Sequence, residues 1–389
     1  MRAIQYGRQD ISKADIDAVV AVLRSDFLTQ GPAVPTFEKA VANWCNAEYA
    51  VAVNSATSAL HIACLALGVG SGDIVWTTPI TFVASANCAL YCGASIDFVD
   101  IDSRTYNLSV ERLSEKLIEA EKIGKLPKIV IPVHFSGQPC EMAAIYSLSQ
   151  KYGFKIIEDA SHAIGGKYKD EPIGNCRFSD ITIFSFHPVK IITTGEGGIA
   201  ITNNAQLASQ MRLLRSHGIS SNSSDMKPRP RNEVWNYQQI DLGFNYRMTD
   251  IQAALGLSQI QRLDEFVTKR HHIAERYDNE LLALPIQTPW QHPDSYSAYH
   301  LYVIRLNLGE IKKTQRQIYD ELHAANIFVN LHYIPVYRQP YYEGMGFNSG
   351  YCQEAERYYS EALSIPLYPT LTGKQQERVV KVINKLVGL

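Results

Sequence analysis

The sequence predicts an α/β fold, and two features of the chain carry this prediction. Short β-rich runs alternate with helical patterns over the first two thirds, which is typical of a mostly parallel sheet covered on both faces by helices. The pattern changes near residue 250, which predicts a large domain over 1–250 and a smaller α+β domain over 251–389. Seven strands are expected in the large domain, at 49–53, 74–77, 96–99, 128–133, 155–158, 181–186 and 199–202.

Helical patterns lie between most of these strands, and an Ala-rich helix follows the first strand directly. The segment 220–237 is rich in Ser, Asn and Pro and is expected to be a long loop. The second domain opens with a long helical stretch over 249–284 that ends near Pro285. The other helices are expected at 56–67, 83–91, 142–152, 206–216, 313–325, 352–363 and 373–387, with a strand at 300–306 and a loop at 332–335.

Bulk properties exclude several classes of function. The net charge of -2 argues against nucleic acid as a partner, because phosphate neutralisation requires clustered Lys and Arg. The short basic stretch 227–231 is broken by proline and is expected to be a mobile loop. No stretch approaches about 20 apolar residues, so no membrane partner is expected. The seven scattered cysteines and the lack of an apolar leader predict a cytoplasmic protein with reduced thiols and no metal site.

Lys190 is the most informative single residue. A run of apolar and aromatic residues over 184–189 precedes it, and a glycine-rich turn over 193–198 follows it. Burial disfavours the ammonium form of lysine, and the neutral amine can attack an aldehyde to form a Schiff base. The alternative is a lysine at a strand end whose amine reaches solvent. This segment alone does not separate the two interpretations.

Two further candidate sites lie at expected strand ends, where open α/β sheets bind their ligands. Asp159 ends a buried strand, and an acid there needs a cationic partner, such as the protonated ring nitrogen of pyridoxal phosphate. Ser55 can cap the helix that begins at Ala56, and the amides of Ala56 and Thr57 would then face an anion such as phosphate. Ordinary helix capping is the alternative explanation at both places.

Two weaker signals point to the same region. Ser185 lies five residues before Lys190 and would add a hydroxyl to the phosphate site. Phe82 would stack on a planar ring, although most phenylalanines at the start of a helix belong to the core. The glycines over 195–198 lack a following Gly-Lys-Ser/Thr, and those over 68–72 end a helix rather than opening one. Neither glycine cluster therefore indicates ATP or NAD.

Together these motifs resemble the DegT/DnrJ/EryC1/StrS family of sugar aminotransferases, a branch of the fold-type I pyridoxal-phosphate enzymes. The resemblance covers nearly the whole chain. It implies pyridoxal 5'-phosphate as the cofactor, a nucleotide sugar and glutamate or 2-oxoglutarate as substrates, and a homodimer with shared active sites. The matching motifs lie at 6–9, 28–32, 54–57, 158–162, 184–198, 243–248, 332–333 and 363–368.

The resemblance also implies roles for the catalytic and ring-binding residues. Lys190 would hold the cofactor covalently and Asp159 would bind its pyridinium nitrogen. His162, where many relatives carry Gln, would contact the cofactor's 3-oxygen, and Phe82 would stack on the ring. Some relatives carry histidine in place of the lysine and are dehydratases, so Lys190 favours transamination.

Two further groups of residues are implied for the phosphate and the sugar nucleotide. The phosphate would be held by Ala56, Thr57 and Ser185, and by Asn245 from the partner subunit of the homodimer. The residues implied for the sugar-nucleotide site are Tyr6, Asp26, Phe27, Leu28, Thr29, His332 and Tyr333.

Within the family, the motifs at 6–9 and 187–198 resemble the branch that serves pseudaminic acid biosynthesis. That branch aminates the 4-keto carbon of a UDP-linked 4-keto-6-deoxy-N-acetyl hexosamine to form UDP-4-amino-4,6-dideoxy-N-acetyl-β-L-altrosamine. Ile191 departs from the branch, which carries proline there. Two alternatives stay open, an aminotransferase for another nucleotide-linked keto sugar and a non-catalytic regulator that keeps the fold.

Overall fold

The computed structural model describes residues 3–228 and 233–388. At its centre is a seven-stranded sheet made of β2 (Tyr49–Val53), β3 (Ile74–Thr77), β4 (Ser95–Phe98), β5 (Ile129–Ile131), β6 (Lys155–Asp159), β9 (Ile181–Ser185) and β10 (Gly198–Thr202). Their order across the sheet is β2-β10-β9-β6-β5-β3-β4. The pairs from β9 to β4 are parallel, and β10 runs antiparallel to β2 and β9. The predicted mostly parallel seven-stranded sheet is confirmed.

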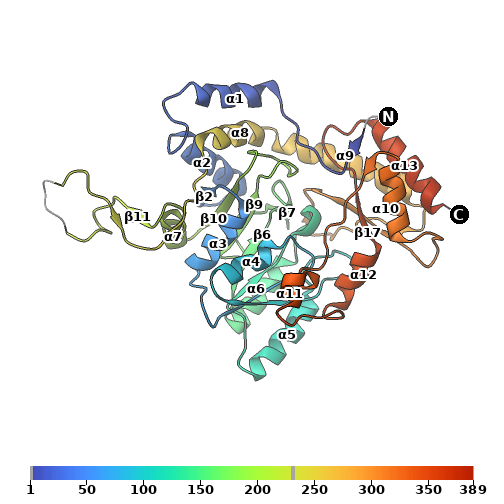
Figure 1. Ribbon diagram of the computed structural model, residues 1–389, viewed down its shortest axis with the longest axis horizontal. Coiled ribbons are helices and arrows are strands. Elements are labelled where there is room, and N and C mark those ends of the chain that lie inside the picture. Colours follow the sequence, from blue (N-terminus) through green and yellow to red (C-terminus); the bar gives the residue numbers. More distant parts are fainter. Residues whose placement is uncertain (1–2, 229–232, 389) are drawn as a thin grey trace.

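Helices cover both faces of this sheet (Figure 1). Because side chains alternate along a strand, each strand supplies both faces: Ala50 and Ala52 pack into one apolar cluster, and Val51 and Val53 pack into the other. The first cluster includes α2 (Ala33–Cys45), α5 (Val110–Lys122), α6 (Met142–Tyr152) and α8 (Asp250–Ile260). The second includes α3 (Ala56–Ala66), α4 (Ala84–Tyr91) and α7 (Ala205–Arg215).

The C-terminal part has its own small sheet and apolar cluster. In the sheet, β15 (Tyr302–Leu306) lies between β13 (Ile286–Gln287) and β17 (Ala362–Ile365). The cluster includes α9 (Leu263–Leu281), α10 (Gln315–Ala324) and α13 (Gly373–Val387). The N-terminal β1 (Ile4–Gln5) pairs with β16 (Ile327–Phe328), so the chain's first strand joins this part. The division at 250/251 stays a prediction.

The remaining elements are short or peripheral. They are α1 (Lys13–Leu23), β7 (Lys167–Tyr168), β8 (Glu171–Pro172), β14 (Ser295–Tyr296), α11 (Pro340–Glu343), α12 (Gln353–Glu361) and the 3-10 turns η1 (Phe135–Gly137) and η2 (Val336–Arg338). Among the helices of the described ranges, none has the length and apolar content needed to cross a bilayer.

The predicted boundaries of two helices were wrong. The stretch over 249–284 is two helices, since α8 ends at Ile260 and α9 begins at Leu263. At the break, Gln259 and Arg262 reach across to Asp15 Oδ2, at 2.7 and 2.8 Å. The helix expected over 352–363 ends at Glu361, because residues 362–365 pair with β15. Contacts between distant segments decide both boundaries, and a local pattern does not report them.

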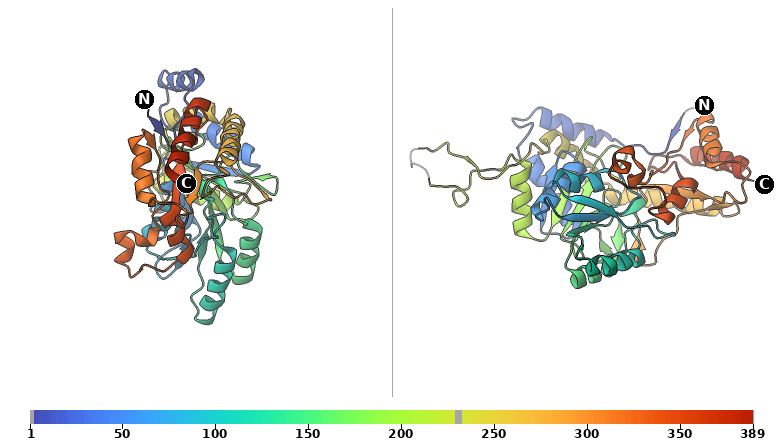
Figure 2. Two further views of the ribbon diagram at one scale, coloured as in Figure 1. Left: turned by 90° about the vertical axis from the view of Figure 1, so that its right-hand side faces the viewer. Right: turned by 60° about the horizontal axis from the view of Figure 1, so that its bottom comes forward.

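A long segment projects from the body between β11 (Ile219–Ser220) and β12 (Gln238–Gln239), which pair antiparallel at its base (Figures 1 and 2). Residues 229–231 of the expected basic loop lie outside the described residues. On this arm Val234 and Trp235 are 86 and 74% exposed, and Leu242, which follows β12, is 75% exposed.

Asp250 holds the start of α2 against α8. Its carboxylate accepts hydrogen bonds from the amides of Gly31 (2.6 Å), Ala33 (2.7 Å) and Val34 (3.0 Å), and the residue is buried. The loop that contains residues 26–29 is tied down at the same place, because the Asp250 amide donates to the Leu28 carbonyl.

Asp250→Ala should lower the free energy of unfolding by about 3 kcal/mol or more, because three amides lose a charged acceptor. Urea unfolding followed by circular dichroism measures this. The control is Asp17→Ala, which removes only an exposed pair with Lys13 and should cost less than about 0.5 kcal/mol. Equal losses in the two variants would contradict the role given to Asp250.

Candidate active site

The ends of β2, β6 and β9 and the start of β10 meet at one edge of the sheet, beside a cavity of about 930 Å³. We call this the sheet-edge cavity. Strands from both halves of the sheet deliver their ends to it, as expected for a ligand site of an open α/β sheet. Ten of the residues predicted from the sequence line it, namely Tyr6, Ala56, Thr57, Phe82, Asp159, His162, Ser185, Lys190, His332 and Tyr333.

Lys190 lies on the wall of this cavity rather than on the outer surface. It belongs to the loop between β9 and β10, and its amide donates to the His187 carbonyl at 2.9 Å. Its side chain opens into the cavity, and burial among protein atoms lowers the pKa of its amine to about 8, while the charge of Asp159 opposes the shift. A substantial fraction of the amine is therefore neutral near physiological pH.

Asp159 ends β6 and is held in one orientation. Ser85, on α4, donates its hydroxyl to Oδ2 at 2.6 Å, and the Ser161 amide donates to Oδ1 at 3.1 Å. The alternative interpretation, that Asp159 caps a following helix, is wrong, because a turn over 161–165 and then β7 follow β6, and the bond to Ser161 belongs to this turn. The bond to Ser85 is an addition that the sequence analysis missed, because its two partners are 74 positions apart. The neighbouring Glu158 points to the opposite face and binds His134 Nε2 at 2.7 Å.

The first turn of α3 presents its amides at the same edge. Ser55 caps the helix as expected, accepting from the Ser58 amide at 3.1 Å. Gly198 allows the close approach of this turn to β10, because a Cβ at Gly198 would lie 2.4 Å from the Ala56 nitrogen. The free amides at a helix start and the helix dipole attract anions. The buried Ser185 lines the cavity beside this turn.

Aromatic rings line the other side of the cavity. Phe82 is 60% exposed and precedes α4, so it is not a core residue and offers an open face for stacking. The rings of Tyr6 and His332 are 5.1 Å apart. Burial is the main cause that lowers the pKa of His332 to about 3 and raises the pKa of Tyr333 above its ordinary value. Both side chains are therefore neutral near physiological pH.

The structure adds residues to the site that the sequence analysis missed. His300 and Asn330 line the cavity, and His300 packs on His162 with ring centroids 4.4 Å apart. Both residues come from the C-terminal part, and no motif or spacing relates them to Lys190. His300 and Asn330 reach the cavity only because the C-terminal part packs against this edge of the sheet.

Five predicted residues do not line the sheet-edge cavity of their own chain. Asp26, Phe27, Leu28 and Thr29 are exposed on the loop between α1 and α2. Asn245 is also exposed, although its carbonyl accepts a long bond from Asn54 Nδ2 at 3.4 Å. Their implied roles stay predictions. Ile191, the departure from the expected branch, is buried in the core away from the cavity wall.

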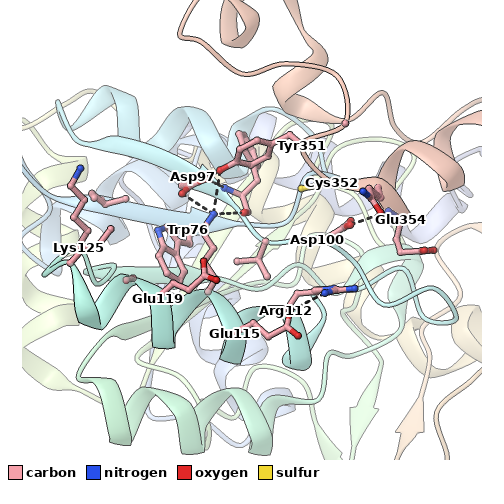
Figure 3. Close-up of a pocket in the computed structure, with 18 residues that line it drawn as sticks. Trp76, Asp97, Asp100, Arg112, Glu115, Glu119, Lys125, Tyr351, Cys352 and Glu354 are labelled. Carbon is pink, nitrogen blue, oxygen red and sulfur yellow. Dashed lines mark hydrogen bonds and ion pairs between the residues drawn. The ribbon is translucent and has the colours of Figure 1, made fainter.

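A second cavity, of about 620 Å³, lies between α5 and residues 350–354 (Figure 3). Several of its charged groups are bound to neighbouring groups. Lys116 pairs with Asp97 Oδ2 at 2.7 Å, and Asp100 accepts from the amides of Glu354 and Ala355 at 2.9 and 3.0 Å. In contrast to the sheet-edge cavity, this cavity has its nearby helix start, that of α12, occupied by the carboxylate of Asp100. The chemistry therefore belongs to the sheet-edge cavity.

The residues of the sheet-edge cavity fit an aldehyde cofactor that carries a cationic ring nitrogen and a phosphate. Lys190 supplies the amine, and Asp159 supplies an oriented carboxylate. The first turn of α3, which Gly198 allows to lie close to β10, supplies anion-binding amides. The fold and this site fit one class of protein: an α/β enzyme that works through such a cofactor.

Comparisons with known proteins identify the family. Residues 9–384 match the DegT/DnrJ/EryC1/StrS aminotransferase family, and the chain belongs to it. Aminotransferases of this family depend on pyridoxal phosphate, which confirms the expected cofactor. The resemblance inferred from the sequence motifs is thereby confirmed over nearly the whole chain.

Individual relatives and a solved structure support this family assignment. The chain is 37% identical over 387 residues to the spore coat polysaccharide biosynthesis protein SpsC of Bacillus subtilis, covering 99% of this chain and 97% of that protein. It is 38% identical over 378 residues to the UDP-4-amino-4,6-dideoxy-N-acetyl-beta-L-altrosamine transaminase of Campylobacter jejuni subsp. jejuni serotype O:2, covering 97% and 95%. The structure of Helicobacter pylori PseC, described as an aminotransferase of pseudoaminic acid biosynthesis, superposes with a TM-score of 0.89 at 30% identity and 99% coverage of both chains.

In the cofactor-free protein, Lys190 should react with amine-directed reagents with a midpoint near pH 8, since its pKa is lowered to about 8. Trinitrobenzenesulfonate labelling, read peptide by peptide by mass spectrometry, measures this. Asp159→Asn should move the midpoint to lower pH, because the Asp159 charge raises the pKa of Lys190. The exposed Lys13 is the internal control, and a Lys190 midpoint equal to that of Lys13 would refute the lowered pKa.

Proposed function

We propose that this protein transfers the amino group of glutamate to the 4-keto carbon of a UDP-linked 4-keto-6-deoxy-N-acetyl hexosamine. The product is UDP-4-amino-4,6-dideoxy-N-acetyl-β-L-altrosamine, an intermediate of pseudaminic acid biosynthesis. One observation carries the chemistry: Lys190 and Asp159 face the same cavity beside the first turn of α3. The 38% identity to the Campylobacter jejuni transaminase supports the choice of sugar.

Each residue has a definite task in this reaction. Bound pyridoxal phosphate supplies the electron sink that stabilises a carbanion at the reacting carbon. Lys190 would hold the cofactor, and its amine would take a proton from the α-carbon of the amino donor and give one to the sugar carbon that receives the amino group. Asp159, held by Ser85 and Ser161, would keep a proton on the ring nitrogen. Amides of Ala56 and Thr57, with Ser185, would bind the phosphate, and Phe82 would support the ring.

The charge of the cavity supports a homodimer with shared sites. Lys190 is the one lysine or arginine among the described residues that line the cavity, and the cofactor engages it. Glutamate and a sugar diphosphate bring several negative charges, so further binding groups must come from another chain. The exposed Asn245 and the loop over 26–29 are suited to reach the partner's cavity. The exposed apolar arm between β11 and β12 supplies surface for the contact.

We also place the enzyme in the cytoplasm. All seven cysteines are unpaired thiols, and six of them are buried. Thiols persist in a reducing compartment, which supports this location.

A second candidate substrate is another nucleotide-linked keto sugar. The identity to SpsC, which is named for spore coat polysaccharide biosynthesis, is 37% and equals that to the transaminase within one percentage point. A panel of 4-keto and 3-keto nucleotide sugars, each assayed for amination with glutamate, separates the two candidates. Turnover of a 3-keto sugar alone would replace the proposed substrate.

The purified protein with pyridoxal phosphate should show an absorbance band that glutamate bleaches. Lys190→Ala should lose this band and all turnover while it keeps the native circular dichroism spectrum, because only the covalent attachment is removed. Lys167→Ala, at an exposed position outside the cavity, is the matched control and should behave as the wild type. A Lys190→Ala protein with undiminished turnover would contradict the proposed role of Lys190 in the reaction.

Mixing two inactive variants should restore activity if the site is shared. A dimer of one Lys190→Ala chain and one Asn245→Asp chain has one site with both defects and one intact site. Because half of the randomly mixed dimers are hybrids, about a quarter of wild-type activity should return. If Asn245 served its own chain's cavity, every site would carry one defect and the mixture would stay inactive.

A further inference from the structure

The hydrogen bonds of His162 define its protonation. The backbone amide of Ser136 donates to His162 Nδ1 at 3.2 Å. A ring nitrogen that accepts a hydrogen bond carries no proton, and a neutral imidazole then carries its proton on the other nitrogen. The proton of His162 is therefore on Nε2, which faces the Tyr333 hydroxyl at 3.3 Å.

The turn that carries this amide is held rigidly. Ser136 has φ 62° and ψ 0°, a left-handed conformation that costs energy for a residue with a side chain. Its hydroxyl donates to the Leu301 carbonyl at 2.7 Å, and the Ala298 amide donates to the Gly137 carbonyl at 3.0 Å. A Cβ at Gly137 would lie 2.8 Å from the Tyr299 nitrogen. The turn is thus clamped against residues 298–301, which lead into β15.

The groups that face His162 disfavour a second proton. Burial lowers its pKa well below the ordinary value, and the nearby Lys190 and His332 lower it further. His300 packs on its ring, and Tyr333 is a neutral phenol. Two acids line the cavity, Glu196 and Asp159, and Asp159 is already engaged by Ser85 and Ser161.

We propose that the Ser136 amide fixes His162 as the neutral tautomer protonated at Nε2, so that it donates one hydrogen bond in a single direction into the cavity. In the described structure the Tyr333 oxygen receives this bond, which leaves the phenol proton free to point onward. The identification of the cofactor's 3-oxygen as a recipient rests on the proposed function, whereas the tautomer does not. Ser136 is a positioning residue, and His162 is the donor.

The same geometry predicts which side chains can replace His162. A glutamine side chain offers an oxygen that accepts from the Ser136 amide and an N–H that donates on the other side. Methionine fills a similar volume and offers neither. His162→Gln and His162→Met are therefore a matched pair that separates hydrogen bonding from packing.

The direct test is nitrogen NMR of the cofactor-loaded protein labelled with ¹⁵N-histidine, with the His162 signal assigned by its loss in His162→Gln. The expected result is an unprotonated Nδ1 and a protonated Nε2, constant between about pH 6 and 8.5. A proton on Nδ1, or titration within this range, overturns the proposal. Either result would leave the transaminase assignment intact, because that assignment rests on Lys190.

The pH profile of kcat gives a second readout. His162→Gln should lose less than about tenfold in kcat and keep the shape of the wild-type profile, because neither side chain changes charge. His162→Met should lose about 100-fold, since the directed donor is gone. A wild-type profile with a step near pH 6.5 that His162→Gln abolishes would overturn the proposal. If the wild type had no transaminase activity but its His162 still carried the proton on Nε2 across the pH range, the proposed function would be overturned and the proposed tautomer would stand.

Discussion

The opposition between burial and charge at Lys190 is the constraint on which the site depends. Burial withdraws the proton from the amine, and the carboxylate of Asp159 restores part of its affinity, which leaves a pKa of about 8. A fully exposed lysine would stay protonated, and a buried lysine without an acid nearby would lose the proton too readily to return it. An amine that must both bind and transfer protons near neutral pH needs this balance.

The sheet places the acid close to the amine because several of its strands end at one edge. Asp159 closes β6, Ser185 closes the adjacent β9, and the chain then loops through Lys190 before β10 returns antiparallel. Gly198 opens β10 directly under the first turn of α3, where a larger residue would collide with the Ala56 nitrogen. Acid, amine and anion-binding amides therefore share one cavity without any of them lying on a flexible surface loop.

The C-terminal part closes the cavity and supplies neutral polar groups. His300, His332 and Tyr333 are uncharged near neutral pH because burial disfavours their charged forms. Lys190 is the one lysine or arginine among the described residues that line this cavity, so the polar surface around it is otherwise made of neutral side chains, backbone amides and the acids Asp159 and Glu196.

The sequence by itself determined the strands of the large domain, because apolar runs are local signals, and its family motifs indicated the cofactor and ten residues that line the cavity. Apolar runs such as 49–53 and 74–77 match β2 and β3 to the residue, Asp159 and Ser55 stand at a strand end and a helix start, and Lys190 lies in the loop that follows β9. Only the tertiary structure decided the break between α8 and α9, the bond from Ser85 to Asp159, and the arrival of His300 at the cavity. Each of these depends on contacts between residues that are far apart in the chain. Such contacts leave no periodicity or spacing in the sequence, since they are set by how whole layers pack.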